Sequence, residues 1–327
     1  MCARISFAIR VYYNCRLRGR TLKAIYRNIV LIYNPAAGGL RKRRSELEEA
    51  VKALRNAGHF VEMVATNGPF TASVIAREAI RQGTDLVLVA GGDGTVNEAL
   101  NGMVPSEVPL AVLPAGTANV LATELRIGHS LYQAAGQLSR WIPRRISVGQ
   151  LLVSQPPLAR YFLLMAGAGF DAQIVTQLNL SLKARHGKLA YWLTGFCQVT
   201  HKLNEFTVSV QGKDFACSFA LASRVRNYGG TFEIARHASL LNEELAIVLF
   251  KGSNPFCYGK YLAGVLSGRL ERMAGVRFLR ARQMDCFCSV PKEVFVQVDG
   301  EAAGRLPVTV KIVPNAVTLL MPAEFSG

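Results

Sequence analysis

The stretch of residues 85–102 constrains the fold of this chain more than any other part of the sequence. Residues 86–90 form a short apolar run rich in branched side chains, as in a strand buried on both faces. The run ends at the sequence Gly-Gly-Asp-Gly (residues 91–94), and from residue 95 apolar residues recur at helical spacing. A strand, a glycine-rich loop and a helix are therefore predicted in direct succession.

A loop between a strand end and a helix start offers backbone N–H groups and the positive end of a helix dipole, which favour an anion. Glycine lets the backbone approach a phosphate closely, Asp93 can hold a metal ion or a proton, and Thr95 can cap the helix. The pattern predicts phosphate chemistry. An ordinary strand–turn–helix connection is the alternative, because Gly-Gly and Asp-Gly are common in turns.

Two further loops have the same position between a strand and a helix. Residues 110–113 are a predicted strand, followed by Pro-Ala-Gly-Thr-Ala-Asn at 114–119. Residues 29–33 are another, followed by Asn-Pro-Ala-Ala-Gly-Gly at 34–39 and a helix from about 45 to 57. Three loops of this kind at one edge of a parallel sheet predict a nucleotide site.

The order of elements predicts an α/β protein. Strands and helices alternate up to residue 113, with a strand at Phe60–Ala65 and a helix from about 71 to 81, which indicates a parallel sheet covered by helices. From about residue 146 short alternating strands take over, namely Val148–Val153, Tyr161–Ala166, Phe206–Gln211, Phe215–Ser223 and Leu245–Phe250. We predict a basic extension at 1–27, an α/β nucleotide-binding domain at 28–145 and a β-rich domain at 146–327.

Composition narrows the classes of partner. The formal charge is +16, from 38 basic and 22 acidic residues, which suits acidic small molecules, anionic membrane surfaces or nucleic acid. Because the basic residues are dispersed and no zinc-ligand spacing or RNA-binding strand is found, no nucleic-acid partner is expected. The seven scattered cysteines indicate reduced thiols in a cytosolic protein. We predict that the extension 1–27 is either a membrane-surface anchor or an unstructured segment.

Three motifs resemble the catalytic domain of the diacylglycerol kinase family, which includes bacterial lipid kinases, sphingosine kinases and ceramide kinases. They are Asn34-Pro35-x-x-Gly38, Gly91-Gly92-Asp93-Gly94-Thr95-x-Asn97-Glu98 and Leu113-Pro-x-Gly116-Thr117-Ala-Asn119. Their order and spacing also agree, and the likeness continues from Asn28 to Pro322. The resemblance implies an ATP- and Mg²⁺-dependent lipid kinase of phospholipid biosynthesis, with a β-sandwich second domain and an active-site cleft between the domains.

The resemblance also assigns nucleotide contacts, to Asn34, Pro35, Gly38, Thr66, Gly91, Gly92, Asp93, Gly94, Thr95, Asn97, Gly116 and Thr117. For Thr66 a simple polar strand end is an equal alternative. One or two residues of the basic run 41–44 could neutralise the triphosphate, and a solvated first helical turn accounts for the others.

Phosphoryl transfer to a hydroxyl group needs a residue that accepts the hydroxyl proton. Glu301, in an Asp-Gly-Glu sequence like that of the family, is the first candidate for this general base. Asp93 is the second, and is otherwise an organiser of metal or phosphate. The alternative for Glu301 is a surface acid in a turn. Asp171 resembles the family's aspartate that faces the polar head of the acceptor, or else caps the following helix.

The chain departs from the family at one turn, where the family binds a structural Mg²⁺ through a carboxylate and flanking carbonyl groups. The ligands here would be Leu240, Glu243 and Leu245, with Glu243 at the aspartate position and Glu244 at the glycine position. Because Mg²⁺ is strict about geometry and a side chain restricts the turn, this site is either altered or lost.

The sequence is compatible with three functions. The first is transfer of the γ-phosphate of ATP to a diacylglycerol-like or sphingoid lipid. The second is an NAD-kinase-like phosphotransferase, and the third is a non-catalytic protein that binds a nucleotide or a lipid. With no run long enough to cross a bilayer, we expect a cytoplasmic protein that meets its lipid substrate peripherally at the inner face of the membrane.

Overall fold

The computed structural model describes residues 26–170, 172, 203–229, 232–288 and 293–327. Asp171 and most of the basic extension lie outside these ranges. Within them, no helix has both the length and the apolarity needed to cross a bilayer. The four cysteines that they include carry free thiols.

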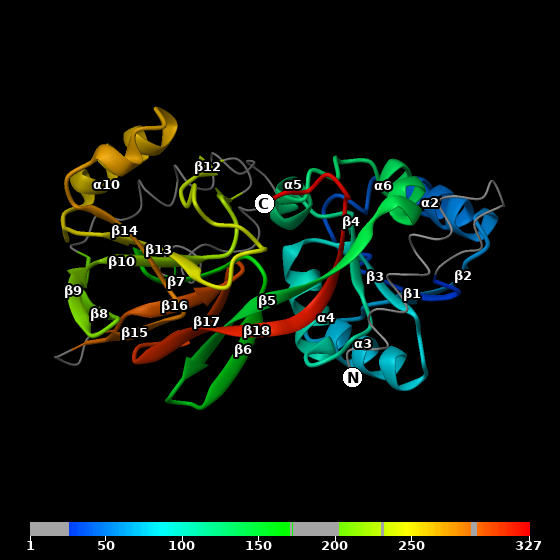
Figure 1. Cartoon of the computed structure of the whole chain (residues 1–327), viewed down its shortest axis with the longest axis horizontal. Coiled ribbons are helices and arrows are strands. Elements are labelled where there is room, and N and C mark those ends of the chain that lie inside the picture. The colour runs from blue at the N-terminus through cyan, green and yellow to red at the C-terminus, as the bar shows by residue number, and fades with distance from the viewer. Residues whose placement is uncertain (1–25, 171, 173–202, 230–231, 289–292) are drawn as a thin grey trace.

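The first domain is a parallel sheet with helices on both faces (Figure 1). Its strands lie in the order β2-β1-β3-β4. They are β1 (Asn28–Tyr33), β2 (Phe60–Ala65), β3 (Leu86–Gly91) and β4 (Leu110–Pro114). The helices are α2 (Arg44–Asn56), α3 (Thr71–Arg81), α4 (Asp93–Met103), α5 (Val120–Glu124) and α6 (Leu131–Gln137), followed by the 3₁₀ turn η1 (Leu138–Arg140). Helix α2 packs against α6, and α3 against α4. Every residue of β3 is buried, as its apolar run predicts.

The second domain is a sandwich of two sheets. One has the order β14-β13-β10-β7-β16-β17, and the other is a continuation of the first domain's sheet, β18-β15-β8-β9, with β5 and β6 alongside. Residues such as Leu151, Val208 and Val310 of the continued sheet pack against Ala220, Ile247 and Val296 of the other to form the core.

The strands of the sandwich have the following bounds: β5 (Ile142–Val153), β6 (Leu158–Phe162), β7 (Met165–Gly169), β8 (Phe206–Val210), β9 (Lys213–Cys217), β10 (Phe219–Ser223), β13 (Leu245–Phe250), β14 (Val276–Ala281), β15 (Gln283–Phe287), β16 (Phe295–Val298), β17 (Glu301–Arg305) and β18 (Val308–Met321). The short pair β11 (Asn227–Tyr228) and β12 (Phe232–Glu233), helix α10 (Pro255–Leu266) and the turn η2 (Leu270–Arg272) complete the described elements.

Two long strands join the domains. Strands β5 and β18 pair along almost their whole length, and Figure 1 shows them crossing from one domain to the other. The far end of β18 pairs with β4, at Leu319 and Leu110. The predicted boundary between residues 145 and 146 therefore falls inside a continuous strand, and the last strand of the chain belongs to the sheet of the first domain.

Candidate active site

The three predicted loops meet at the carboxyl edge of the parallel strands. The amide of Asn34, after β1, donates to Oγ1 of Thr95, in the first turn of α4, at 3.4 Å. A Cβ atom on Gly39 would lie only 2.5 Å from the carbonyl oxygen of Ala115, in the loop after β4. Backbone so close to backbone admits no side chain, so glycine is required at position 39 for the first and third loops to pack together.

Several predicted nucleotide contacts lie where these loops meet. A Cβ on Gly38 would lie 3.2 Å from Oγ1 of Thr117, and one on Gly92 would lie 3.6 Å from the Cα of Gly116. Gly92 is also the N-cap of α4 and supplies no side-chain cap to that helix. Glycine backbone at an uncapped helix start is a suitable surface for the phosphates of a nucleotide, so the residues present fit this ligand.

Thr66 and Asp93 have defined backbone partners. The N–H of Thr66, directly after β2, donates to the carbonyl of Tyr33 at 2.9 Å, so the backbone of this strand end lies beside the start of the first loop. The carboxylate of Asp93 accepts the N–H groups of Val120 at 3.1 Å and Leu121 at 3.2 Å. Asp93 therefore fixes the glycine loop to the start of α5, which favours its role as an organiser over its role as the base.

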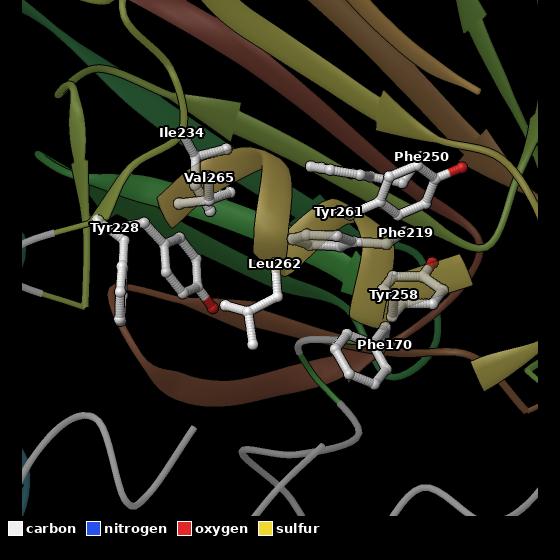
Figure 2. A pocket seen from close by; sticks show the side chains of 10 residues that line it. Phe170, Phe219, Tyr228, Ile234, Phe250, Tyr258, Tyr261, Leu262 and Val265 are labelled. Carbon is white, nitrogen blue, oxygen red and sulfur yellow. The ribbon is translucent and has the colours of Figure 1, made fainter. Parts of the chain in front are cut away.

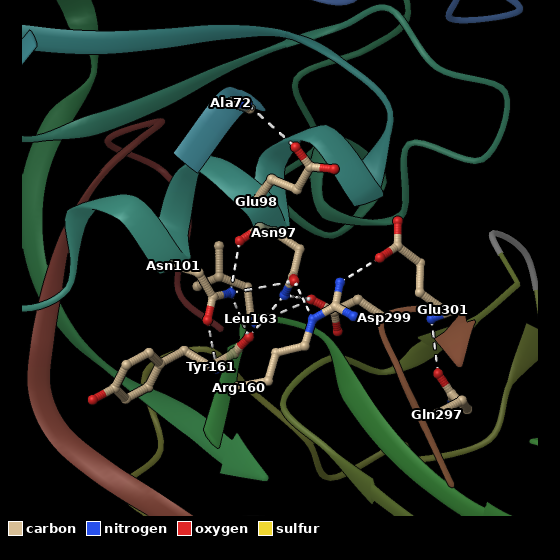
Figure 3. Close-up of polar contacts among 11 residues, drawn as sticks. Ala72, Asn97, Glu98, Asn101, Arg160, Tyr161, Leu163, Gln297, Asp299 and Glu301 are labelled. Atoms are coloured by element: carbon tan, nitrogen blue, oxygen red, sulfur yellow. Dashed lines mark hydrogen bonds and ion pairs between the residues drawn. The ribbon is translucent and has the colours of Figure 1, made fainter. Parts of the chain in front are cut away.

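Glu301 reaches the glycine loop from the second domain (Figure 3). It is the first residue of β17, and a Cβ atom on Gly94 would lie 2.5 Å from its Oε1. Arg160 of β6 forms an ion pair with the Glu301 carboxylate and donates from Nε to Oδ1 of Asn97 at 3.1 Å. The carboxylate side chain is 41% exposed while Arg160 is 13% exposed, so the candidate base is held by a largely enclosed guanidinium and still faces solvent.

The turn before Glu301 explains how the carboxylate is aimed. Asp299 and Gly300 have φ values of 49° and 82°, the positive values that a two-residue hairpin of type I′ requires. The Asp299 carboxylate accepts N–H groups from Leu163, Leu164 and Met165 at 2.8–3.3 Å. Burial raises the pKa of Asp299 to about 7, against the opposing effect of these hydrogen bonds. Asp299 thus anchors the hairpin, and Glu301 projects from it.

Asn97 connects the two domains. We predicted a nucleotide contact for it, but its side-chain amide donates to Oδ2 of Asp299 at 2.8 Å and to the carbonyl of Tyr161 at 2.9 Å. Asn101, one helical turn later, donates to the same carbonyl and accepts the N–H of Tyr161 (Figure 3). The i, i+4 spacing of the two asparagines was the signal for a shared helix face. No sequence signal singled out Arg160.

Within the basic run 41–44, Arg43 has a role that neither interpretation predicted. Arg43 pairs with Glu46 at 2.7 Å and donates to the carbonyl groups of Pro114 and His129, so it stabilises the fold. The other three residues of the run are exposed. Glu46 in turn accepts from the hydroxyl and the N–H at the start of α6, from Ser130 and Leu131, both at 2.8 Å. The hydrogen bond from Arg43 is the main reason that the pKa of Glu46 is lowered to about 2.

We expect Glu46→Gln to lower the free energy of unfolding at pH 7 by about 1–2 kcal/mol, because the carboxylate bonds join α2 to α6. Since the pKa of Glu46 is about 2 in the folded state against an ordinary 4.5, its contribution is complete above pH 4.5 and is lost as the pH falls towards 2. Chemical denaturation between pH 2 and pH 7 measures the difference between wild type and variant. Glu48→Gln, an exposed acid on the same helix, is the control; equal effects for the two would contradict this role.

At the turn 240–245, where we predicted that the family's structural metal site is either altered or lost, the residues present do not fit a metal ion. Leu245 begins strand β13, and the carboxylate of Glu243 pairs with Arg282 at 2.7 Å on the surface. The carbonyl of Leu240 accepts from Arg224 at 2.6 Å. Across the described ranges, no group of three or more His, Cys, Asp or Glu residues could hold a metal ion. The predicted carbonyl ligand and the predicted carboxylate ligand therefore each bind an arginine of the chain.

An apolar pocket lies between α10 and the sandwich sheet that contains β10 and β13 (Figure 2). Its lining consists of apolar and aromatic residues: Phe170, Phe219, Tyr228, Phe232, Ile234, Phe250, Tyr258, Tyr261, Leu262 and Val265. The hydroxyl group of Tyr258 is within 2.7 Å of that of Ser218, and Tyr261 donates to the carbonyl of Lys251. With these hydroxyl groups engaged by the protein, the rings present an apolar surface.

Comparisons with known proteins agree with this architecture. Residues 28–151 match the model of the diacylglycerol kinase catalytic domain, and residues 165–321 match that of the YegS C-terminal NAD kinase beta sandwich-like domain. A diacylglycerol kinase of Bacillus subtilis (strain 168) is 27% identical over 300 residues, covering 90% of this chain and 96% of the relative. A diacylglycerol kinase of Staphylococcus aureus is 26% identical over 283 residues, covering 85% of this chain and 87% of the relative.

Solved structures share the fold. A crystal structure of a diacylglycerol kinase from Bacillus anthracis str. Sterne superposes with a TM-score of 0.74 at 22% identity, over 92% of this chain and 99% of that one. Another crystal structure from the same organism has a TM-score of 0.78 at 21% identity, over 94% and 99% of the two chains. The predicted α/β domain and β-sandwich are thereby confirmed.

Proposed function

Because this chain belongs to the diacylglycerol kinase catalytic-domain family, we propose that it transfers the γ-phosphoryl group of ATP to the hydroxyl group of a diacylglycerol-like or sphingoid lipid. The observation that carries this proposal is the position of Glu301. A carboxylate from the second domain lies against Gly94 of the glycine loop, where a donor phosphate and an acceptor hydroxyl would meet. That is the arrangement that an in-line transfer needs.

In this proposal each domain has one task. The loops at 34–39, 91–95 and 114–119 hold the nucleotide through backbone N–H groups, and bound ATP with its Mg²⁺ supplies the phosphoryl group. Glu301 accepts the proton of the lipid hydroxyl, and Arg160 holds the carboxylate in position. Asp299 and Asn97 keep the second domain in register with α4.

The apolar pocket supports a lipid acceptor over a soluble one. Strand β7 leads from Met165, which binds Asp299, to Phe170 at the pocket. At the usual rise of a strand, these five steps span about 17 Å, a length that a long acyl chain can bridge. We propose that the pocket holds an acyl chain while the hydroxyl group lies near Glu301.

The experiment incubates the purified chain with γ-labelled ATP, Mg²⁺, NAD and a panel of lipids in detergent micelles, and follows the label into the organic phase and onto NAD. Label on a lipid supports the proposal, and the labelled species names the acceptor. Label on NAD instead would move the assignment to an NAD-kinase-like phosphotransferase. Bound ATP without any transfer would indicate a non-catalytic nucleotide-binding protein.

We expect Val265→Trp to raise the KM for a long-chain lipid by about tenfold or more, because the indole would fill the pocket. The KM for a short-chain analogue and the KM for ATP should change little. Ala263→Trp, an exposed position on the same helix, is the matched control. If both lipids lose affinity equally, or if the two variants behave alike, the pocket does not hold the acyl chain.

A further inference from the structure

The side chain of Arg224, directly after β10, is a fully buried positive charge. Among the described residues no carboxylate pairs with it. Its Nη1 donates to the carbonyl of Asn242 at 2.5 Å and lies 3.4 Å from that of Glu244. Its Nη2 donates to the carbonyls of Leu240 at 2.6 Å and Ser147 at 3.0 Å. Four backbone oxygens therefore surround one guanidinium group.

This cage has the form of a cation site. Carbonyl groups of the alternate residues 240, 242 and 244 point to one side of the turn, as backbone oxygens do around a bound metal ion. A planar guanidinium with its donors in a fixed fork can bind several such oxygens at once. A divalent ion would in addition need acidic ligands, and Glu243 is drawn away to Arg282 at the surface.

We propose that the guanidinium of Arg224 is the permanent cation of the turn 240–245 and takes the place of a structural metal ion there. The chain then folds and keeps this turn in place without any bound divalent ion. The inference concerns the fold rather than the transfer reaction, and it holds whichever acceptor the enzyme uses. The Mg²⁺ that accompanies ATP is a separate ion.

The segment that carries Arg224 is also hydrogen-bonded to residues that hold the Asp299 turn in place. The backbone N–H of Arg224 donates to the carbonyl of Leu164 at 2.7 Å, and the N–H of Leu164 donates to the Asp299 carboxylate at 3.1 Å. Two residues later, Arg226 pairs with Glu124 of α5 at 3.2 Å. The segment that carries the guanidinium is thus bonded to the support of the catalytic hairpin and to the first domain.

The first test uses the wild-type chain without nucleotide. Metal analysis after gel filtration should find no stoichiometric divalent ion, and the Tm should agree within about 1 °C in EDTA, in Mg²⁺ and in Ca²⁺. A stoichiometric bound ion, or a Tm that EDTA lowers and Mg²⁺ restores, would overturn the proposal. Neither measurement depends on kinase activity, so this result stands apart from that of the lipid assay.

Variants provide the second test. Arg224→Met should lower the Tm by about 5 °C or more, because it leaves buried carbonyl groups without donors. Arg224→Lys keeps a positive charge and should lower the Tm by less. Its Tm is the measurement to use if the methionine variant does not fold. Arg282→Met, which removes an exposed arginine beside the same turn, should shift the Tm by about 1 °C at most. Equal losses for Arg224→Met and Arg282→Met would contradict the proposal.

Discussion

Replacing Glu301 by glutamine is expected to lower kcat for lipid phosphorylation by a factor of about 10²–10⁴, the usual contribution of a general base. The amide has the shape of the carboxylate and can still accept a hydrogen bond from Arg160, but it cannot accept the proton of the acceptor hydroxyl. Because the nucleotide loops are untouched, the KM for ATP and the Tm should stay close to those of the wild type.

The control for this variant is Glu293→Gln, an exposed acid of the same domain that pairs with Arg305. It should retain full turnover. Should Glu301→Gln keep kcat within about threefold of the wild type, Glu301 is not the base, and Asp93 becomes the remaining candidate. The kcat of Asp93→Asn would then be measured. We also expect this variant to loosen the contact between the loops, because the Asp93 carboxylate is the acceptor for the N–H groups of Val120 and Leu121.

The largest expected effect on stability is at Asp299. Asp299→Ala should lower the free energy of unfolding by about 3–5 kcal/mol, because it leaves the N–H groups of residues 163–165 without their acceptor and removes one of the two acceptors of the Asn97 amide. Chemical denaturation measures the loss. Asp214→Ala, an exposed acid in the hairpin of β8 and β9, should change it by less than about 0.5 kcal/mol.

The pH dependence of Asp299 has the opposite sign to that of Glu46. Its pKa is about 7 in the folded state against an ordinary 3.8, so between these values the folded chain retains a proton that the unfolded chain has lost. Its contribution to stability is therefore complete below pH 3.8 and falls as the pH rises to 7, by on the order of 2 kcal/mol. Asp299→Asn removes this term. Parallel stability curves for wild type and Asp299→Asn between pH 4.5 and pH 7 would contradict the assignment.

The meeting of the three loops was predictable because it depends on local patterns. Strand β2 has the predicted bounds, and α3 spans the predicted range 71–81. Each glycine-rich loop follows a short buried run, so the parallel sheet alone brings them to one edge. The tertiary pairs were not predictable from one sequence, since no local pattern links Arg160 to Glu301 or Arg224 to the carbonyl groups of a distant turn.

Two predicted strands of the second domain are wrong, for one physical reason. The run Phe215–Ser223 is two strands, β9 and β10, that belong to different sheets, and Tyr161–Ala166 likewise spans the end of β6 and the start of β7. In the strands of both sheets of a sandwich, apolar residues that face the core alternate with outward-facing residues. The hydrophobic periodicity therefore continues where the chain passes from one sheet to the other. At the first break the Ser218 hydroxyl binds the carbonyl of Gly252 and meets the hydroxyl of Tyr258.

The path of β18 sets the order in which the molecule can be assembled. The sheet of the first domain is complete only when Leu319 has reached Leu110, which precedes it by most of the chain. During synthesis, the edge of β4 therefore stays without its neighbour until the sandwich has been translated. Such distant pairing slows folding and leaves an open strand edge in the meantime. A fragment that ends before β18 would keep that edge permanently and is expected to associate with itself, so the first domain is best studied within the whole chain.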